Sequence, residues 1–140
     1  MEIDPRGPRF GAVITTVVLA AVLVTGSTWL LAAQVAVFAV GALAGLRYAP
    51  YGLLYRRFIR PRLGPPGHTE AEAPPRFSQA MGMVIAGLGV VCLAAGATVA
   101  GLVFTALALA AAFLNAAFDL CLGCQVYLFI QRNQRVRPSA

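Results

Sequence analysis

The stretch Phe10–Leu46, FGAVITTVVLAAVLVTGSTWLLAAQVAVFAVGALAGL, decides the fold of this chain. Its 37 residues carry no charge. A helix that crosses a membrane needs roughly 20 apolar residues, so this stretch is too long for one span and suits two short ones. The small residues Thr25–Thr28, TGST, mark the turn between them. We therefore expect membrane-spanning helices near 9–26 and 28–48.

A second apolar stretch, Phe77–Gln131, is expected to hold two more spans, because Asp119 is its single charged residue. Two glycines frame a tight connection in the segment GATVAG at 96–101. Backbone polar groups cannot stay unpaired in lipid, so both runs must be helical. The expected helices lie near 78–97 and 101–131, and residues 49–77 form a cytoplasmic loop. The predicted fold is all-α, a single membrane domain over 1–140 built as a polytopic four-helix transmembrane bundle.

The composition supports this class and excludes most soluble ones. Hydrophobic residues make up 59% of the chain, charged residues only 11%, and the mean hydropathy is +0.77. A soluble domain carries roughly a quarter charged residues. The sequence has no nucleotide-binding motif, catalytic triad or paired-carboxylate pattern, and it leaves open whether the protein is an enzyme.

The cations predict the orientation in the membrane. The chain has eleven cationic residues, all of them arginine. With four spans, the N-terminus, the central loop and the C-terminus share one side, and every arginine lies there. The positive-inside rule places both termini in the cytoplasm, with the protein in the inner (plasma) membrane. The set is Arg6, Arg9, Arg47, Arg56, Arg57, Arg60, Arg62, Arg76, Arg132, Arg135 and Arg137.

A cleaved signal peptide is the competing interpretation of the N-terminus, because Arg6 and Arg9 precede an apolar stretch. It is disfavoured because Glu2 and Asp4 lie in the would-be basic region, and no small-x-small site precedes Trp29. The arginines adjoin helix ends and several tyrosines, which is typical of contact with lipid headgroups, so no nucleic-acid partner is expected.

The region between the two apolar stretches divides into two parts. Pro50–Ile59 mixes aromatic residues with arginines and is expected to lie along the inner membrane surface. The following residues, 60–75, are rich in proline and glycine and predict a flexible loop. His68, Glu70 and Glu72 on this loop are read as solvated side chains, so neither a metal ion nor a cofactor is expected.

One face of the last predicted helix carries small and polar residues at helical spacing, which favours close packing between membrane helices. Helix two offers a matching Gly41-x-x-x-Gly45, and its Gln34 is expected to bridge helices. Asp119 would face the bundle interior, with Asn115 one turn away and Arg47 at similar depth to neutralise it. A packing role and a role in proton or substrate handling both stay open for this polar group. The face comprises Thr105, Ala108, Ala112, Asn115, Ala116, Asp119 and Gly123.

The pair Cys121-Leu122-Gly123-Cys124 is the candidate catalytic site, while Cys92 is expected to be an apolar filler. Cysteines three apart on a helix are within disulfide reach. In a reducing cytoplasm such a pair is typical of catalytic, redox-sensing or metal-binding sites. On a continuous helix it would lack the activation that a helix N-terminus gives. Cys124 is then expected to be the more reactive thiol, because Cys121 would lie a turn deeper in lipid.

Two stretches, IDPRGPRFG at 3–11 and FDLCLGC at 118–124, resemble a known family. The chain is similar over nearly its whole length to the small actinobacterial membrane proteins called domain of unknown function forty-three ninety-five. The resemblance implies a four-helix inner-membrane protein with a cysteine pair in its last helix. Genes for members of this family occur near genes for thioredoxin-like and sulfurtransferase proteins. The resemblance therefore implies thiol or sulfur chemistry.

Three functions stay open on the sequence. The leading hypothesis is a membrane-bound thiol–disulfide or sulfur-relay component, in which Cys121 and Cys124 exchange with a cytosolic thioredoxin-like or rhodanese-like partner. The alternatives are a small transporter for a soft metal ion or sulfur species and a non-catalytic membrane scaffold, and homo-oligomerisation is compatible with each. Four-helix quinone-linked disulfide oxidoreductases differ, because they carry an extracytoplasmic pair and a second pair in a loop.

Overall fold

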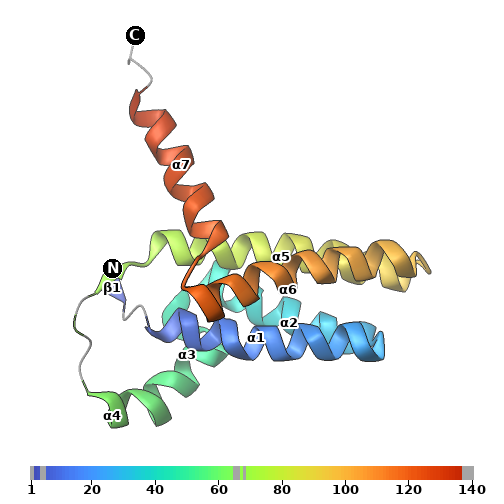
Figure 1. Ribbon diagram of the computed structural model, residues 1–140, viewed down its shortest axis with the longest axis horizontal. Helices are drawn as coiled ribbons and strands as arrows, with labels where there is room; N and C mark the ends of the chain where they lie inside the picture. The colour runs from blue at the N-terminus through green and yellow to red at the C-terminus, as the bar shows by residue number, and fades with distance from the viewer. Residues whose placement is uncertain (1, 4–5, 65–66, 68, 137–140) are drawn as a thin grey trace.

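Four antiparallel helical segments form the body of the molecule in the computed structural model, which describes residues 2–3, 6–64, 67 and 69–136 (Figure 1). The long helices α1 (Arg6–Thr25), α5 (Ala73–Ala94) and α6 (Thr98–Phe118) are long and apolar enough to cross a membrane. Helix α2 (Thr28–Ala39) and the π-helical turn η1 (Val40–Ala44) together form a shorter apolar helix. The prediction of an all-α multi-pass membrane protein is confirmed.

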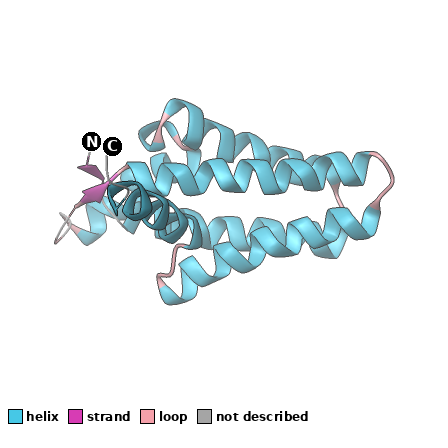
Figure 2. Cartoon of the chain, turned by 90° about the horizontal axis from the view of Figure 1, so that it is seen from above, coloured by secondary structure: helices cyan, strands magenta, loops and turns pink. Residues whose placement is uncertain are grey.

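The four segments close into a ring in which α1 contacts α6, α6 contacts α5, α5 contacts α2, and α2 returns to α1. Two tight turns at one end make the hairpins, as Figure 2 shows from above. Gly26 and Gly96 adopt positive φ there, and the Ser27 hydroxyl accepts the Leu30 N–H at 3.2 Å to cap α2. Both turns lie where the small residues of the sequence predict them.

The bundle interior is thin, as membrane packing through small residues requires. Leu19 and Val22 of α1 form one buried cluster with Leu31 and Phe38 of α2. The small residues Ala86 of α5 and Ala108 of α6 complete it. A Cβ on Gly82 of α5 would lie 2.9 Å from the Phe38 ring. The helices approach closely there because α5 has no side chain at that position.

The expected loop over 49–77 is largely helical, which corrects the sequence prediction. The chain runs through η2 (Leu46–Tyr48), α3 (Pro50–Leu54), η3 (Tyr55–Ile59) and α4 (Arg60–Leu63). Two short strands, β1 (Glu2–Ile3) and β2 (Glu70–Ala71), pair antiparallel beside them.

This region forms helices because it is anchored on the bundle. Tyr55 is only 2% exposed and packs toward α1, where a Cβ on Gly7 would meet its ring at 3.5 Å. The helix expected over 28–48 stops at Ala44, because Gly45 turns the backbone to a φ of +115°. His68 lies outside the described residues, as does Arg137.

Arginines at this end of the bundle cap helix C-termini. Arg76 of α5 donates to the carbonyls of Ala42 and Leu43 at 2.7 and 3.0 Å, where η1 ends. Arg9 of α1 donates to the Ala116 carbonyl of α6 at 3.2 Å. Unpaired carbonyls and the negative end of the helix dipole meet at each C-terminus, and a guanidinium satisfies both.

The last predicted helix, 101–131, is instead two helices, and this is the main correction to the predicted fold. Helix α6 ends at Phe118, and α7 (Leu122–Val136) begins after three residues in another direction. Figures 1 and 2 both show α7 leaving the bundle at a steep angle to the other helices, near the end of the bundle where α1 begins. A single helical wheel therefore describes the side-chain directions only up to Phe118, where α6 ends.

Candidate functional site

The break between α6 and α7 is made by Asp119, which adopts a left-handed backbone conformation with φ 57° and ψ 30°. Its N–H donates to the Asn115 carbonyl at 3.1 Å, and the Leu120 N–H reaches the Leu114 carbonyl at 3.2 Å. Such bonds satisfy the last carbonyls of a helix when the residue after it is left-handed. Aspartate is among the few non-glycine residues that visit this region, so the sequence can turn here without glycine.

The predicted polar group of Asp119, Asn115 and Arg47 is not assembled. Asp119 is exposed at the helix end, and Asn115 contacts it only through the backbone, where the Asn115 carbonyl accepts the Asp119 N–H. Within the described part of the chain, no ion pair joins Asp119 to Arg47. The Arg47 guanidinium instead donates to the Tyr48 hydroxyl at 2.7 Å and lies 4.7 Å from the centre of that ring.

The predicted packing face of α6 is correct in its first half. Thr105 and Ala108 are buried in the bundle, whereas Ala112, Asn115 and Ala116 are half-buried. The face ends with the helix, so Gly123 belongs to α7 and not to this surface. Gln34 of α2 bridges helices as expected, since its amide accepts from Tyr51 of α3 at 2.7 Å and donates to Thr15 of α1 at 3.5 Å.

Cys121 occupies the N-cap position of α7. Its carbonyl accepts the Gln125 N–H at 3.0 Å, which is the first hydrogen bond of the helix, and its Sγ accepts the Cys124 N–H at 3.1 Å. A serine or aspartate oxygen usually plays this part at a helix N-terminus. Here a sulfur atom does so, at the positive end of the helix dipole, which is the environment that stabilises a thiolate.

Cys124 lies one turn along α7 and forms a disulfide with Cys121, with 5.2 Å between the two Cα atoms. Cys121 immediately precedes α7 and Cys124 lies in its first turn, and the separation of the two Cα atoms is one that a disulfide normally spans. The expectation that the pair lies far along a helix is therefore wrong. The expectation that Cys124 is the more reactive thiol loses its basis, because Cys121 does not lie a turn deeper in one continuous helix.

Helix α7 is held on α5 by contacts that flank the disulfide. A Cβ on Gly123 would lie 2.6 Å from the Cα, Cβ and Oγ of Ser78, so the two helices touch backbone to backbone. The rings of Phe77 and Tyr127 pack one turn further on, with 5.5 Å between centroids. Ser78, Phe77 and Tyr127 belong to no motif of the sequence, and the glycine between the cysteines is the one sequence signal of close packing there.

Four of the five exposed large apolar residues described in α7 gather on one side. At about 100° per residue, Leu122, Val126, Phe129 and Ile130 span roughly a quarter of the helix circumference. All four are exposed, with Phe129 63% accessible. Cys121 and Cys124 lie on the other side, where Gln125 and Arg132 accompany the exposed Leu128. The four-residue apolar side is typical of a helix in a membrane interface, and the disulfide lies on the opposite side, which is mixed polar and apolar.

The family model of DUF4395, described as Domain of unknown function (DUF4395), matches residues 3–132. The chain belongs to this family. The match takes in both the N-terminal stretch at 3–11 and the cysteine pair of the DUF4395 chain. No curated protein and no solved structure matches the chain.

Proposed function

We propose that this DUF4395 protein is a membrane-bound thiol–disulfide exchange component, with Cys121 as the attacking thiol and Cys124 as the resolving one. The observation that carries the proposal is the N-cap position of Cys121, whose Sγ accepts the Cys124 N–H at 3.1 Å. That hydrogen bond and the dipole of α7 stabilise negative charge on this sulfur more than on Cys124. The thiolate is the reactive form of cysteine, so the two thiols are unequal.

The exchange moves two electrons and needs no cofactor. In the reduced protein the Cys121 thiolate attacks a disulfide of the partner, forms a mixed disulfide and releases one partner thiolate. Cys124, deprotonated to water or to that thiolate, then attacks Cys121 Sγ. The mixed disulfide breaks, the Cys121–Cys124 bond forms, and the partner leaves as a dithiol. The reverse sequence reduces the pair at the expense of a partner dithiol.

The place of α7 supports a cytosolic partner. The helix starts at the end of the bundle where the arginine-bearing segments gather (Figure 1), and the positive-inside rule assigns that end to the cytoplasm. The side of α7 that bears the disulfide also carries Gln125, Arg132 and the exposed Leu128, whereas the opposite, apolar side suits the lipid interface. A thioredoxin-like or rhodanese-like protein, which presents its own reactive thiol in a surface loop, fits a disulfide displayed in this way.

The test is trapping of the mixed disulfide in cells. Cys124→Ser, made in a Cys92→Ser background, is expected to accumulate a covalent adduct with a cytosolic thiol protein, because no second thiol resolves it. Cys121→Ser in the same background is expected to form none. The adducts are read on non-reducing gels after alkylation, beside the variant that lacks all three cysteines.

The outcomes separate the possible roles of the pair. An adduct in Cys121→Ser alone would reverse the assignment of the two thiols. If neither variant forms an adduct and the wild-type pair keeps one redox state when cells are oxidised or reduced, the exchange function is wrong. Mass spectrometry of Cys121 distinguishes disulfide exchange from a sulfur relay, which would leave a persulfide on this residue.

A further inference from the structure

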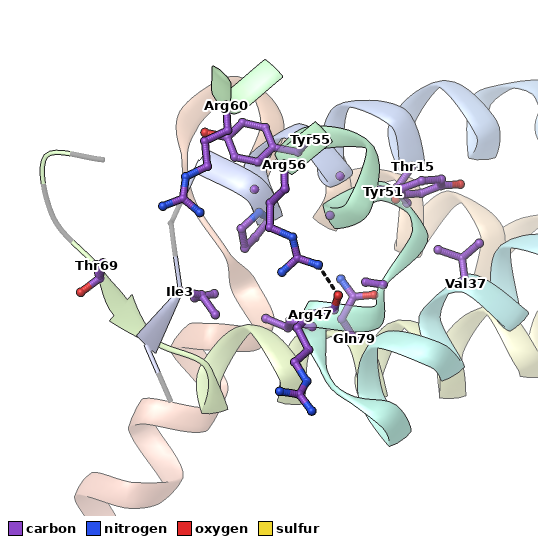
Figure 3. Close-up of a pocket in the computed structure, with 16 residues that line it drawn as sticks. Ile3, Thr15, Val37, Arg47, Tyr51, Tyr55, Arg56, Arg60, Thr69 and Gln79 are labelled. Carbon is purple, nitrogen blue, oxygen red and sulfur yellow. Dashed lines mark hydrogen bonds between the residues drawn. The ribbon is translucent and has the colours of Figure 1, made fainter. Parts of the chain in front are cut away.

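A cavity of about 300 Å³ opens at the arginine-rich end of the bundle (Figure 3). It lies between α1, α2 and the helices α3 and η3, with β1 and the start of α5 at its edge. The stretch at 3–11, which the proposed function leaves unused, supplies Ile3, Gly7, Pro8 and Gly11 to its wall. The cysteine pair is not part of the lining.

The inner wall of the cavity is apolar and built of small residues. Gly7 and Gly11 of α1 face the rings of Tyr55 and Tyr51, where an added Cβ would meet the tyrosine atoms at 3.5 Å. Val37 of α2 closes the far side (Figure 3). The glycines of α1 let the two tyrosines pack close to the helix, and all four residues line the cavity.

Hydroxyl and amide groups line the depth of the cavity. Tyr51 and Thr15 both contribute to the wall, and both bond to the buried Gln34 behind it. Burial raises the pKa of the Tyr51 phenol, which therefore stays protonated and donates to Gln34 at neutral pH. The wall offers hydrogen bonds without offering a negative charge.

Guanidinium groups stand at the mouth. Arg56 extends over the cavity and donates to the backbone carbonyl of Arg47, as the dashed line in Figure 3 shows. Among the described residues, neither Arg47 nor Arg56 forms an ion pair with an acid, and no carboxylate lines the cavity. The neighbouring Arg57 does not belong to the lining; it is exposed and lies 5.8 Å from the centre of the Phe58 ring.

We propose that this cavity binds a phosphate oxyanion, held by Arg56 at the mouth. Arginine presents a planar fork of donors that matches phosphate oxygens two at a time. The volume lies at the small end of ligand pockets, so it takes a headgroup or a small phosphate compound, while a whole two-chain lipid does not fit. The opening lies beside the ends of the membrane-spanning helices, where lipid phosphates lie.

Two sources can supply this oxyanion, a lipid headgroup and a free phosphate, and three probes distinguish them. The full-length protein in neutral detergent is melted in the presence of dihexanoyl phosphatidic acid, dihexanoyl phosphatidylcholine or inorganic phosphate. The concentration that gives half the maximal rise in Tm measures the apparent affinity. Phosphatidic acid is expected to raise Tm at lower concentration than phosphatidylcholine, whose choline neutralises the phosphate. A rise with inorganic phosphate as well assigns the site to free phosphate compounds.

The matched variants are Arg56→Gln and Arg57→Gln, which remove the same charge from adjacent positions. Arg56→Gln is expected to weaken the apparent affinity about tenfold or more, the loss of a charged hydrogen bond, while Arg57→Gln keeps it. Equal responses of the two variants would overturn the proposal. So would equal responses to the two lipids, or no response of the wild type.

A second variant covers the case in which Arg56→Gln fails to fold. Val37→Phe adds a ring to the inner wall without changing charge and is expected to abolish the rise in Tm by filling the cavity. An undiminished response in Val37→Phe would show that the oxyanion binds elsewhere on the surface, and the proposal would fail.

Discussion

Asp119 matters through its backbone more than through its carboxylate. The sequence presents it as a lone acid within an apolar run, which favours a buried, paired or protonated side chain. In the structure it is exposed, and its left-handed φ of 57° ends α6 and sets where α7 begins. Cys121 becomes an N-cap because this turn precedes it.

The backbone role of Asp119 predicts an unusual order of substitutions. Asp119→Gly is expected to keep or slightly raise the free energy of unfolding, since glycine adopts positive φ without strain. Asp119→Val is expected to lower it by about 1–2 kcal/mol, because a β-branched residue resists this conformation. Unfolding in mixed micelles measures both, with Asp119→Asn as the near-neutral control. If Asp119→Gly and Asp119→Val lower the free energy of unfolding equally, the carboxylate and not the backbone conformation is what stabilises the fold.

The candidate site could be predicted from sequence only in part. The spacing of Cys121 and Cys124 predicts that they are neighbours, and they are. The N-cap position of Cys121 could not be predicted from the helical wheel, because the wheel assumes an unbroken helix through Asp119. An aspartate gives a weaker stop signal than glycine or proline, so hydrophobicity alone extended α6 over the turn.

At the scale of elements, the position of α7 depends on its contact with α5. Gly123 touches Ser78 backbone to backbone, and the Phe77–Tyr127 ring pair lies beside it. The apolar side of α7 remains exposed, so these contacts fix where the helix lies on the bundle.

Gly123→Ala is therefore expected to loosen α7 from the bundle, because its Cβ would lie 2.6 Å from Ser78 atoms that include backbone. Limited trypsin digestion should cleave after Arg132 several times faster than in the wild type. Gly87→Ala on α5 is the control, since a Cβ there meets nothing within 4 Å. The prediction is wrong if the two variants are cleaved at the same rate.

The long helices could be predicted from hydrophobicity, whereas the helices of residues 46–63 could not. Proline, glycine and arginine in this region are typical of a loop. Two tyrosines outweigh them, because Tyr55 is buried beside Gly7 and Tyr51 reaches Gln34 inside the bundle. Those contacts join residues far apart in the sequence, and periodicity carries no information on them.

At the scale of the whole molecule, the hairpin turns lie at one end and the arginine-bearing segments at the other (Figure 1). We expect the second end to face the cytoplasm. Alkaline phosphatase fused after residue 27 should be active, whereas fusions after residue 70 or residue 140 should be inactive. A fluorescent protein at the same positions should give the opposite pattern. Phosphatase activity after residue 70 would contradict this orientation.

The arginine caps also limit how such a chain can diversify. Small bundles with few cations can drift, by exchanging a handful of charges between their two ends, toward inserting in both directions. Here Arg9 and Arg76 close helices α6 and α2–η1, so the residues that would set the direction of insertion also complete the hydrogen bonding of the fold. Moving them would leave helix carbonyls without donors. Proteins that keep these contacts are therefore restricted to one direction of insertion. A homologue inserted the other way would need different groups to bond the carbonyls at these helix ends.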